Sequence, residues 1–414
     1  MKGKKFRILM INDHIHFGGG GDAAFQLERL AYENAGYAVY TFSESDTSAG
    51  GWGEYDRVYL ESGNRFVKKA GKFLFDYGVY NALRGVVESI SPDLIKVHLV
   101  SKYPASVYAA LSYADCPVIQ ILHGPNLFCA TAWGCYRKDS QACEMGIDSK
   151  CYRNGCVSLP ACMLHIAANR LTMPFVMKNV DLFLCPSAHL LKSVRDLGLG
   201  EAELLPLGID PEFSRATPVP FEGPPTILYV GALIVQKGIH FLLEAFRIVK
   251  TRIPEARLVL AGAGEFRSAL EAQAARLGLG QEVEFKGFVD RSRILPVYQK
   301  AHVLAVPSVW KEQFGLVGPE ALACGVPCVG SDIGGIPEWL HDGEWGFLVP
   351  PREASMLADR LIAVLVDGEL RMRFAAKGRE FVLREFPPEK YQANVLRYAE
   401  TYIGTKGTRV ARGQ

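Results

Sequence analysis

Apolar runs of strand length alternate with helix-like patterns along most of the chain. In the first half these runs lie at 6–12, 37–42, 93–98, 117–123, 181–187 and 202–210. In the second half they lie at 226–231, 256–262, 283–288, 301–308 and 327–332. Short apolar runs that alternate with helical segments are typical of parallel sheets joined by crossover helices. The pattern predicts an α/β fold with two such sheets, facing one another across a central cleft.

The boundary between the two sets of strands predicts the domains. Residues 211–225, PEFSRATPVPFEGPP, contain five prolines and no periodicity, which is typical of an interdomain linker. We therefore expect an N-terminal Rossmann-like domain over 1–210 and a C-terminal Rossmann-like domain over 226–380. Residues 381–404 are expected to form a helix that packs back on the first domain, and 405–414 a flexible tail.

Composition excludes several classes of protein. The chain has 414 residues, of which 49% are apolar and 22% charged, and its net charge is +2. A chain of this length fits two domains of about 200 residues each. The charge does not suggest a nucleic-acid partner. The start, MKGKKFRILMIN, does not resemble a signal peptide, and no apolar run reaches membrane-spanning length, so we expect a cytoplasmic protein.

Six of the ten cysteines lie between residues 129 and 162, within an insert at 124–162 that has little periodicity. A long insert of this kind is usually functional or cross-linked. Disulfides are not expected in a reducing cytoplasm, and there is no C-x-x-C pair. One hypothesis is a structural zinc ion or iron–sulfur cluster bound by four thiolates. The other is a loop with free thiols. The tentative ligands are four of the five residues Cys129, Cys135, Cys143, Cys151 and Cys156.

The stretch 311–322, KEQFGLVGPEAL, carries two glutamates around a glycine-containing turn, Glu312 and Glu320. Pro319 suits the first position of a helix and Gly325 suits its end, which predicts a helix over roughly 319–324. Free backbone N–H groups at such a helix start can bind an anion such as a diphosphate. The alternative is structural, with Glu320 in a helix's first turn and Glu312 solvated.

The surrounding segment 306–351, VPSVWKEQFGLVGPEALACGVPCVGSDIGGIPEWLHDGEWGFLVPP, resembles the C-terminal signature of the retaining glycosyltransferases of family 4. These enzymes have the GT-B fold, and their E-x7-E motif matches Glu312 and Glu320. The resemblance extends over about the whole second domain, and it implies that this domain binds the nucleotide-sugar donor and that the first domain binds the acceptor. In the first domain only the glycine loop, His123 and PLGID at 206–210 resemble the family.

The resemblance implies transfer of a sugar from a UDP-, GDP- or ADP-sugar to a hydroxyl of a sugar or lipid-linked acceptor, with retention, in polysaccharide or glycolipid biosynthesis. It implies that Glu312 and His123 face the donor sugar, that Lys237 pairs with the diphosphate, and that Glu320 binds the ribose. The other implied donor contacts are Gly20, Gly21, Gly231, Gly287, Phe288, Val289, Phe314, Gly315 and Leu316. The chain has no D-x-D, and no cofactor is expected for catalysis.

A cation next to the donor also follows from the chemistry. Negative charge builds on the departing diphosphate, and a fixed ammonium such as that of Lys237 stabilises this charge most in the transition state. Many family members carry Arg where this chain has Ala232. Arg293 or Arg291 is a candidate substitute in a phosphate clamp. The structural alternative for Lys237 is an exposed lysine before a helix.

Two segments of the first domain have competing interpretations. Gly18, Gly20 and Ala23, with Glu44 after the next strand, fit a dinucleotide fingerprint, but five residues separate the first strand from the first glycine. We therefore prefer a glycine loop that approaches the donor phosphate or the acceptor. The basic amphipathic stretch 65–87 predicts either peripheral association with an anionic membrane, at the inner face of the plasma membrane, or a plain surface helix.

Other functions are also compatible with the pattern. The same fold supports sugar-nucleotide epimerases and glycogen-type synthases. A catalytically inactive binding protein, with the cysteine insert as a docking module, is the alternative from another class.

Overall fold

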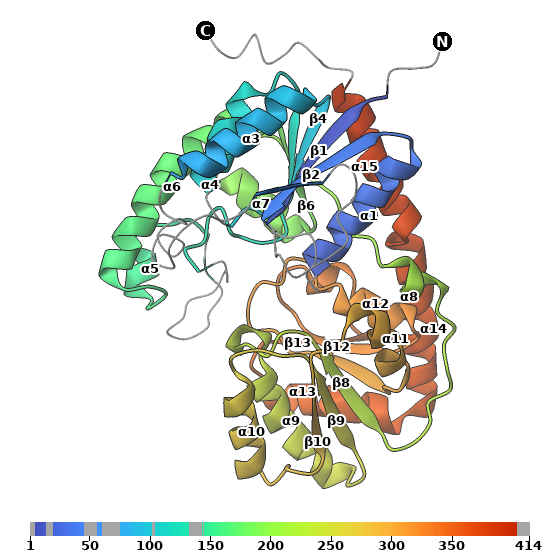
Figure 1. Cartoon of the computed structure of the whole chain (residues 1–414). Helices are drawn as coiled ribbons and strands as arrows, with labels where there is room; N and C mark the ends of the chain where they lie inside the picture. The colour runs from blue at the N-terminus through green and yellow to red at the C-terminus, as the bar shows by residue number, and fades with distance from the viewer. Residues whose placement is uncertain are drawn as a thin grey trace. The chain divides into compact units, whose positions relative to one another are not determined.

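The computed structural model describes residues 5–13, 20–44, 56–59, 75–101, 104–131, 143 and 145–403. The chain divides into two compact units (Figure 1). The first takes in the described residues up to Pro206 together with Tyr391–Ile403, and the second consists mainly of Leu207–Lys390. In the described part of the chain, no helix is long and apolar enough to cross a membrane.

The first unit is built on a seven-stranded parallel sheet with the order β3-β2-β1-β4-β5-β6-β7. Its strands are β1 (Arg7–Ile11), β2 (Ala38–Glu44), β3 (Asp56–Tyr59), β4 (Leu94–Val97), β5 (Val118–Ile121), β6 (Leu182–Cys185) and β7 (Ala202–Leu204). Its helices are α1 (Gly20–Asn34), α3 (Tyr77–Ile90), α4 (Pro104–Ala110), η1 (Leu111–Tyr113), α5 (Lys150–Arg153), α6 (Leu159–Asn179), α7 (Ala188–Asp196) and most of α15 (Pro388–Ile403).

The second unit is built on a six-stranded parallel sheet with the order β10-β9-β8-β11-β12-β13. Its strands are β8 (Thr226–Val230), β9 (Arg257–Ala261), β10 (Val283–Gly287), β11 (Val303–Val306), β12 (Cys328–Ser331) and β13 (Gly346–Val349). Its helices are α8 (Pro211–Arg215), η2 (Val235–Lys237), α9 (Ile239–Arg252), α10 (Arg267–Arg276), α11 (Arg291–Gln299), α12 (Val317–Ala323), η3 (Ile336–Glu338), α13 (Ala354–Val366) and α14 (Gly368–Glu385). Helices lie on both sides of each sheet (Figure 1).

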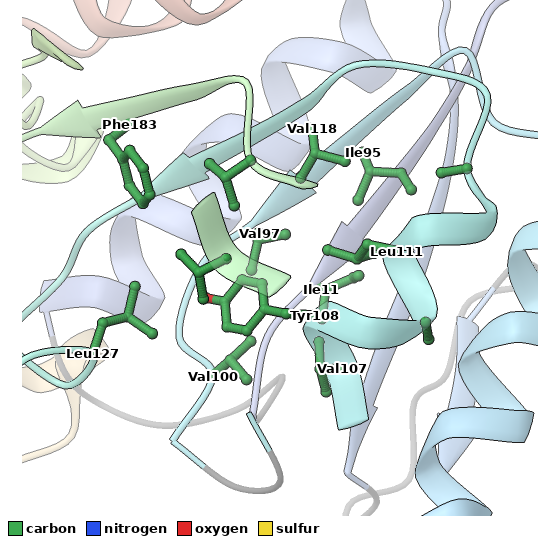
Figure 2. Packing of buried hydrophobic residues seen from close by; sticks show 14 of the residues in the cluster. Ile11, Ile95, Val97, Val100, Val107, Tyr108, Leu111, Val118, Leu127 and Phe183 are labelled. Carbon is green, nitrogen blue, oxygen red and sulfur yellow. The ribbon is translucent and has the colours of Figure 1, made fainter. Parts of the chain in front are cut away.

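Burial explains why these segments are strands. Every residue of β4, β5 and β6 is buried, as are those of β11 and β12, because helices cover both faces of a parallel sheet. In the edge strand β10, exposed residues alternate instead with residues that are buried or half-buried. Figure 2 shows part of the first core, where Tyr108 and Leu111 of the α4–η1 segment point toward Ile95 and Val97 of β4.

The predicted α/β fold with two parallel sheets is confirmed, and each predicted strand overlaps an observed one. Two strands were not predicted, β3 and β13. The predicted helix at 319–324 exists but starts at Val317, so placing Pro319 at its first position was wrong. Gly325 follows its end with φ +77°, as predicted for a helix stop.

Three predicted boundaries were also wrong. Residues 211–215, assigned to a linker, form α8, because the Asp210 carboxylate accepts a hydrogen bond from the backbone N–H of Glu212 and caps the helix. The insert assigned to 124–162 overlaps α6, which begins at Leu159. The helix assigned to 381–404 is two helices, because α14 runs on to Glu385 and α15 begins at Pro388.

The final helix contacts the first unit through polar and apolar side chains. The Tyr391 hydroxyl lies 3.5 Å from Glu28 of α1, and the Tyr398 hydroxyl donates to Glu203 of β7 at 2.7 Å. Val395 and Ala399 are fully buried. These contacts make α15 part of the first unit although it follows the second in sequence.

Candidate functional site

In the second unit, the strand order reverses between β8 and β11, which are neighbours in the sheet. Ligands bind open α/β sheets beyond the carboxyl ends of the strands at such a reversal. The segment after β8 carries Lys237 in η2, and the loop after β11 carries Glu312. The topology therefore brings together two residues that are 75 positions apart in the chain.

Lys237 and Glu312 form a close ion pair. The Lys237 Nζ lies 2.6 Å from the Glu312 Oε1, and the Ser308 hydroxyl donates to the same oxygen at 2.6 Å. The Glu312 side chain is 6% exposed and that of Lys237 is 23% exposed. Burial acts to raise the pKa of Glu312, but the Lys237 charge and the hydrogen bonds outweigh it and lower that pKa. Glu312 is therefore held as a carboxylate.

A glycine at position 238 lets the two loops approach closely enough for this pair. Gly238 has φ +68°, and a Cβ atom there would lie 1.9 Å from the carbonyl oxygen of Pro307. The backbone N–H of Val309 donates to the carbonyl of Gln236 at 2.9 Å across the same junction. Any side chain at position 238 would push η2 away from the β11 loop.

The turn after Glu312 presents backbone donors. Gly315 has φ +82°, and the indole N–H of Trp339 donates to the carbonyl of Phe314 at 2.6 Å. A Cβ atom on Gly318 would lie 2.0 Å from the Trp339 ring, so glycine is required there. Within the described residues, the backbone N–H groups of Phe314, Gly315 and Leu316 donate no hydrogen bond. They remain available to an anion or a hydroxyl.

Glu320 accepts hydrogen bonds from two side chains that were not predicted as its partners. Its Oε1 accepts from Arg291 at 2.8 Å and its Oε2 from the Tyr298 hydroxyl at 3.0 Å. Burial raises the pKa of Glu320, and the Arg291 charge opposes but does not cancel this effect. Arg291 also pairs with Asp210 at 3.1 Å.

Two cations were expected as substitutes for a missing arginine. Arg291 lies between Glu320 and Asp210, which fixes it to carboxylates. Arg293 is exposed on α11 and forms no salt bridge within the described part of the chain. At the position where many family members carry Arg, the Ala232 carbonyl accepts a hydrogen bond from the Tyr229 hydroxyl at 2.8 Å. Lys237 is thus the cation that the structure places beside Glu312.

The remaining donor-contact candidates of this unit lie near the carboxyl ends of its strands. Gly231 directly follows β8 with φ +144°. Gly287 ends β10 with φ +78°, and its carbonyl accepts from the N–H of Gly262 at 2.8 Å. Phe288 is 66% exposed and Val289 is half-buried. An exposed aromatic ring next to open backbone can stack on a planar ligand.

In the first unit, His123 lies two residues beyond β5, near the carboxyl edge of the sheet. Its Nε2 is 2.9 Å from the Nδ1 of His98. Burial, and then the neighbouring His98, lower the pKa of His123 to about 3, so the ring is neutral at physiological pH. Gly20 and Gly21 begin α1, and a Cβ atom on Gly21 would lie 3.1 Å from the Cγ of His123. The structure therefore brings the glycine loop and His123 together.

Three charged or ionisable residues near His123 were not predicted from the sequence. Glu28, Lys96 and His98 are all buried, and they connect α1 to β4. A lysine and a histidine within the apolar run DLIKVH were the available signal. Of the dinucleotide fingerprint, Gly18 and the side chain of Glu44 lie outside the described residues.

The cysteine cluster differs from the tentative ligand set. Cys151, Cys156 and Cys162 pack together, and Cys162 was not among the predicted ligands. Cys143 is buried and Cys129 half-buried, whereas Cys135 lies outside the described residues. Within the described part of the chain, no group of three or more His, Cys, Asp or Glu side chains is arranged to hold a metal ion. The metal hypothesis stays a prediction.

The first unit also contains a cavity of about 160 Å³ near the cysteine cluster. Polar side chains on its wall include Ser101, Asn126, Thr131, His165 and Asn169. The rest of the lining is mostly apolar, with Val100, Leu127 and Ile147 among it. Such a mixture of apolar surface and a few polar groups is usual in small-molecule sites.

The amphipathic stretch 65–87 is only partly described, from Phe75 onward. In α3, Val79, Leu83 and Val87 are buried in the core of the first unit. Arg84 pairs with Glu88 at 2.7 Å, so this cation is neutralised by a neighbour. The lysines at 68, 69 and 72 lie outside the described residues.

Comparison with known proteins is consistent with this geometry. The model of Glycosyltransferase Family 4 matches residues 18–213, and that of Glycosyl transferases group 1 matches residues 210–381. Together they span both units. The fold is that of the GT-B glycosyltransferases, and on the two models, which together span 18–381, the chain belongs to glycosyltransferase family 4.

Curated relatives match over about half of the chain. A phosphatidyl-myo-inositol mannosyltransferase of Mycobacterium leprae is 34% identical over 186 residues, which is 45% of this chain and 48% of the relative. A glycogen synthase of Mycobacterium tuberculosis is 30% identical over 236 residues, 56% of each chain. This chain thus matches about half the length of these curated relatives.

Solved structures match over nearly the whole chain. The match to sucrose-phosphate synthase from Thermosynechococcus elongatus has a TM-score of 0.76 at 22% sequence identity. It covers 96% of this chain and 99% of the synthase chain. The match to Anabaena HepE in complex with UDP-glucose has a TM-score of 0.71 at 18% sequence identity. It covers 95% of this chain and 99% of the HepE chain. At these identities the likeness establishes the fold.

Proposed function

We propose that the protein transfers a sugar from a nucleotide-diphosphate sugar to an acceptor hydroxyl. The observation that carries the proposal is the partly buried Lys237–Glu312 pair, 2.6 Å apart, beside three backbone N–H groups without a hydrogen-bond partner in the described part of the chain. A cation and free N–H groups fit a diphosphate, and a carboxylate fits sugar hydroxyls. Family membership and the UDP and UDP-glucose complexes of HepE support the same class of donor.

Each group has a proposed role. Lys237 stabilises the charge that develops on the departing diphosphate, and the N–H groups of Phe314, Gly315 and Leu316 bind sugar and phosphate oxygens. Glu312 accepts hydrogen bonds from sugar hydroxyls through the lone pairs that Lys237 and Ser308 leave open. Glu320 accepts from the ribose hydroxyls in the same way, with Arg291 and Tyr298 holding its orientation.

We also propose that the anomeric configuration is retained. One Glu312 oxygen already accepts hydrogen bonds from Lys237 and Ser308, which lowers its nucleophilicity and suits a positioning role. No covalent nucleophile is then required, because the acceptor hydroxyl attacks on the same face from which the diphosphate departs. The departing phosphate oxygen takes the hydroxyl proton, so the charges and atoms balance.

The acceptor is proposed to be a sugar or a lipid-linked sugar in polysaccharide or glycolipid biosynthesis. The names of the two relatives, a mannosyltransferase of phosphatidyl-myo-inositol and a glycogen synthase, support these two classes. The cavity of about 160 Å³ in the first unit is a candidate acceptor subsite. For a lipid-linked acceptor, peripheral association with an anionic membrane belongs to the same proposal.

A catalytically inactive sugar-nucleotide binding protein is the second candidate, favoured by Ala232 in place of the usual arginine. Purified protein should be incubated with UDP-, GDP- and ADP-sugars, with release of nucleotide diphosphate and binding measured in parallel. We expect one of the donors to bind, its nucleotide diphosphate to be released slowly without acceptor, and Lys237→Ala to slow this release about a hundred- to a thousandfold. Binding without any release, with or without candidate acceptors, would favour the inactive protein. Neither binding nor release with any donor would contradict both.

A further inference from the structure

The first unit contains a buried chain of ionisable side chains that ends at His123. Glu28 of α1, Lys96 of β4 and His98 after β4 are each 1% exposed or less. The Lys96 Nζ lies 3.1 Å from Glu28 Oε1, and the His98 Nε2 lies 3.4 Å from Glu28 Oε2. The other nitrogen of His98, Nδ1, lies 2.9 Å from the Nε2 of His123. A carboxylate, an imidazole and a second imidazole thus follow one another in line.

The remaining neighbours of Glu28 keep it a hydrogen-bond acceptor. The Tyr32 hydroxyl donates to Oε1 at 2.7 Å, and the Tyr391 hydroxyl lies 3.5 Å from Oε2. Together with the Lys96 ammonium, these groups surround the carboxylate with donors. Both oxygens of Glu28 therefore face hydrogen-bond donors and act as acceptors.

The positions of the protons follow from this order. A neutral imidazole carries one N–H, and a 2.9 Å contact between two ring nitrogens requires one proton between them. The His98 Nε2 lies 3.4 Å from a carboxylate oxygen without forming an aligned hydrogen bond, and at this distance the oxygen attracts a proton on Nε2 and repels a lone pair there. His98 therefore carries its proton on Nε2 and accepts on Nδ1. It follows that the His123 Nε2 donates and that the His123 Nδ1 is an unprotonated lone pair.

The surroundings of the His123 Nδ1 agree with a lone pair there. This nitrogen is buried and has no hydrogen-bond partner among the described residues. It lies beside Gly21 in the first turn of α1, where unpaired backbone N–H groups give a partial positive charge. A Cβ atom on Gly21 would lie 3.1 Å from Cγ and 3.4 Å from Nδ1, so a side chain at position 21 would crowd this edge of the His123 ring.

We propose that Glu28 and His98 are positioning residues that hold His123 in one tautomer, so that His123 accepts a hydrogen bond from a substrate hydroxyl at Nδ1. The inference rests on the proposed function and on the family resemblance, which implies that His123 faces the donor sugar. It adds the direction of the hydrogen bond. A hydroxyl beside Gly21 donates to His123, and a sugar whose hydroxyl is replaced by fluorine or hydrogen cannot make this contact.

The tautomer can be measured without any substrate. In full-length protein labelled with ¹⁵N-histidine, the His123 signals are assigned by their loss in His123→Asn. We expect Nε2 to carry a directly bonded proton and Nδ1 to resonate as an unprotonated nitrogen. A proton on Nδ1, or a rapidly exchanging mixture, would overturn the proposal even if the enzyme is active. Absence of turnover with every donor would contradict the proposed function and leave this measurement valid.

A matched set of variants separates positioning from simple packing. His98→Asn keeps an acceptor oxygen near the place of Nδ1, whereas His98→Phe fills the space without one. We expect His98→Phe to raise the KM for the donor about tenfold, as for loss of one oriented hydrogen bond, and His98→Asn to restore most of it. Equal KM values for the two variants, with the fold intact by circular dichroism, would contradict the positioning role.

The Glu28–Lys96 pair, at the other end of this series of buried side chains, supplies a second test. In Glu28→Gln with Lys96→Met, both charges are removed together, so no buried charge is left unpaired. The new amide group can donate to His98 Nε2, which should move the proton to His98 Nδ1 and hence the proton of His123 to Nδ1. The expected result is an altered ¹⁵N pattern for His123. An unchanged pattern in the folded double variant would show that Glu28 does not set the tautomer.

Discussion

Replacement of Lys237 by methionine should destabilise the second unit in a pH-dependent way. Lys237→Met keeps most of the side-chain volume but leaves the Glu312 carboxylate, 6% exposed, without its cation. Breaking a fully buried ion pair costs about 3–5 kcal/mol. Because Lys237 is 23% exposed and Ser308 still donates to Glu312, we expect about 2–3 kcal/mol near neutral pH.

The sign of the pH dependence follows from the Glu312 pKa. In the native protein this pKa is lowered, so ionisation of Glu312 adds stability above the unfolded value of about 4.3, and that stability is lost as the pH falls through the folded pKa. In Lys237→Met, burial should instead raise the folded pKa, so stability is lost as the pH rises above about 4.3. The difference between the two proteins should therefore be small near pH 4 and largest above neutrality.

Urea unfolding curves at several pH values test this expectation. Trp339 and Trp345 are buried in the second unit and supply a fluorescence signal for it. Lys286→Met is the matched control, because Lys286 pairs with Glu284 at 2.7 Å in the same unit but both side chains are exposed. It should change the free energy of unfolding by less than about 1 kcal/mol. A Lys237→Met effect no larger than this control, or equal at all pH values, would refute the reasoning.

Four further predictions concern three sets of variants and one metal analysis. Lys237→Ala should lower turnover at saturating donor about a hundred- to a thousandfold, and Ala232→Arg should recover part of it; near-full turnover would assign the diphosphate to another cation, with Arg293 the first candidate. Glu320→Ala should weaken donor binding in calorimetry by about 1–3 kcal/mol, and unchanged affinity would remove the ribose role. Gly238→Ala should lower the thermal midpoint, because its Cβ would overlap the carbonyl of Pro307; an unchanged midpoint would contradict the close approach. Elemental analysis of untagged protein should find about one zinc or an iron–sulfur cluster, and less than about a tenth of an equivalent would leave the cysteines as thiols.

The sequence alone was sufficient for the fold class and for the strands at the centre of both sheets. Strands buried on both faces, such as β5 and β11, must be apolar at every position, and this leaves a continuous signal. The short strand β13 was missed, because half of its residues are only partly buried and its run begins with Gly346. Helix α8 was missed because the five prolines of 211–225 suggested a linker, whereas Asp210 and Pro211 form a helix start.

The Glu312 and Glu320 motif could be recognised in the sequence, but the partners of both carboxylates could not. Lys237 reaches Glu312 only because β8 and β11 are neighbours, and Arg291 reaches Glu320 from a helix 29 residues earlier. The chain of Glu28, Lys96 and His98 depends likewise on α1 packing beside β4. Local sequence determines which residues form a strand or cap a helix, because those interactions span a few residues. Pairing between distant side chains depends on strand order, and only the tertiary structure decides that order.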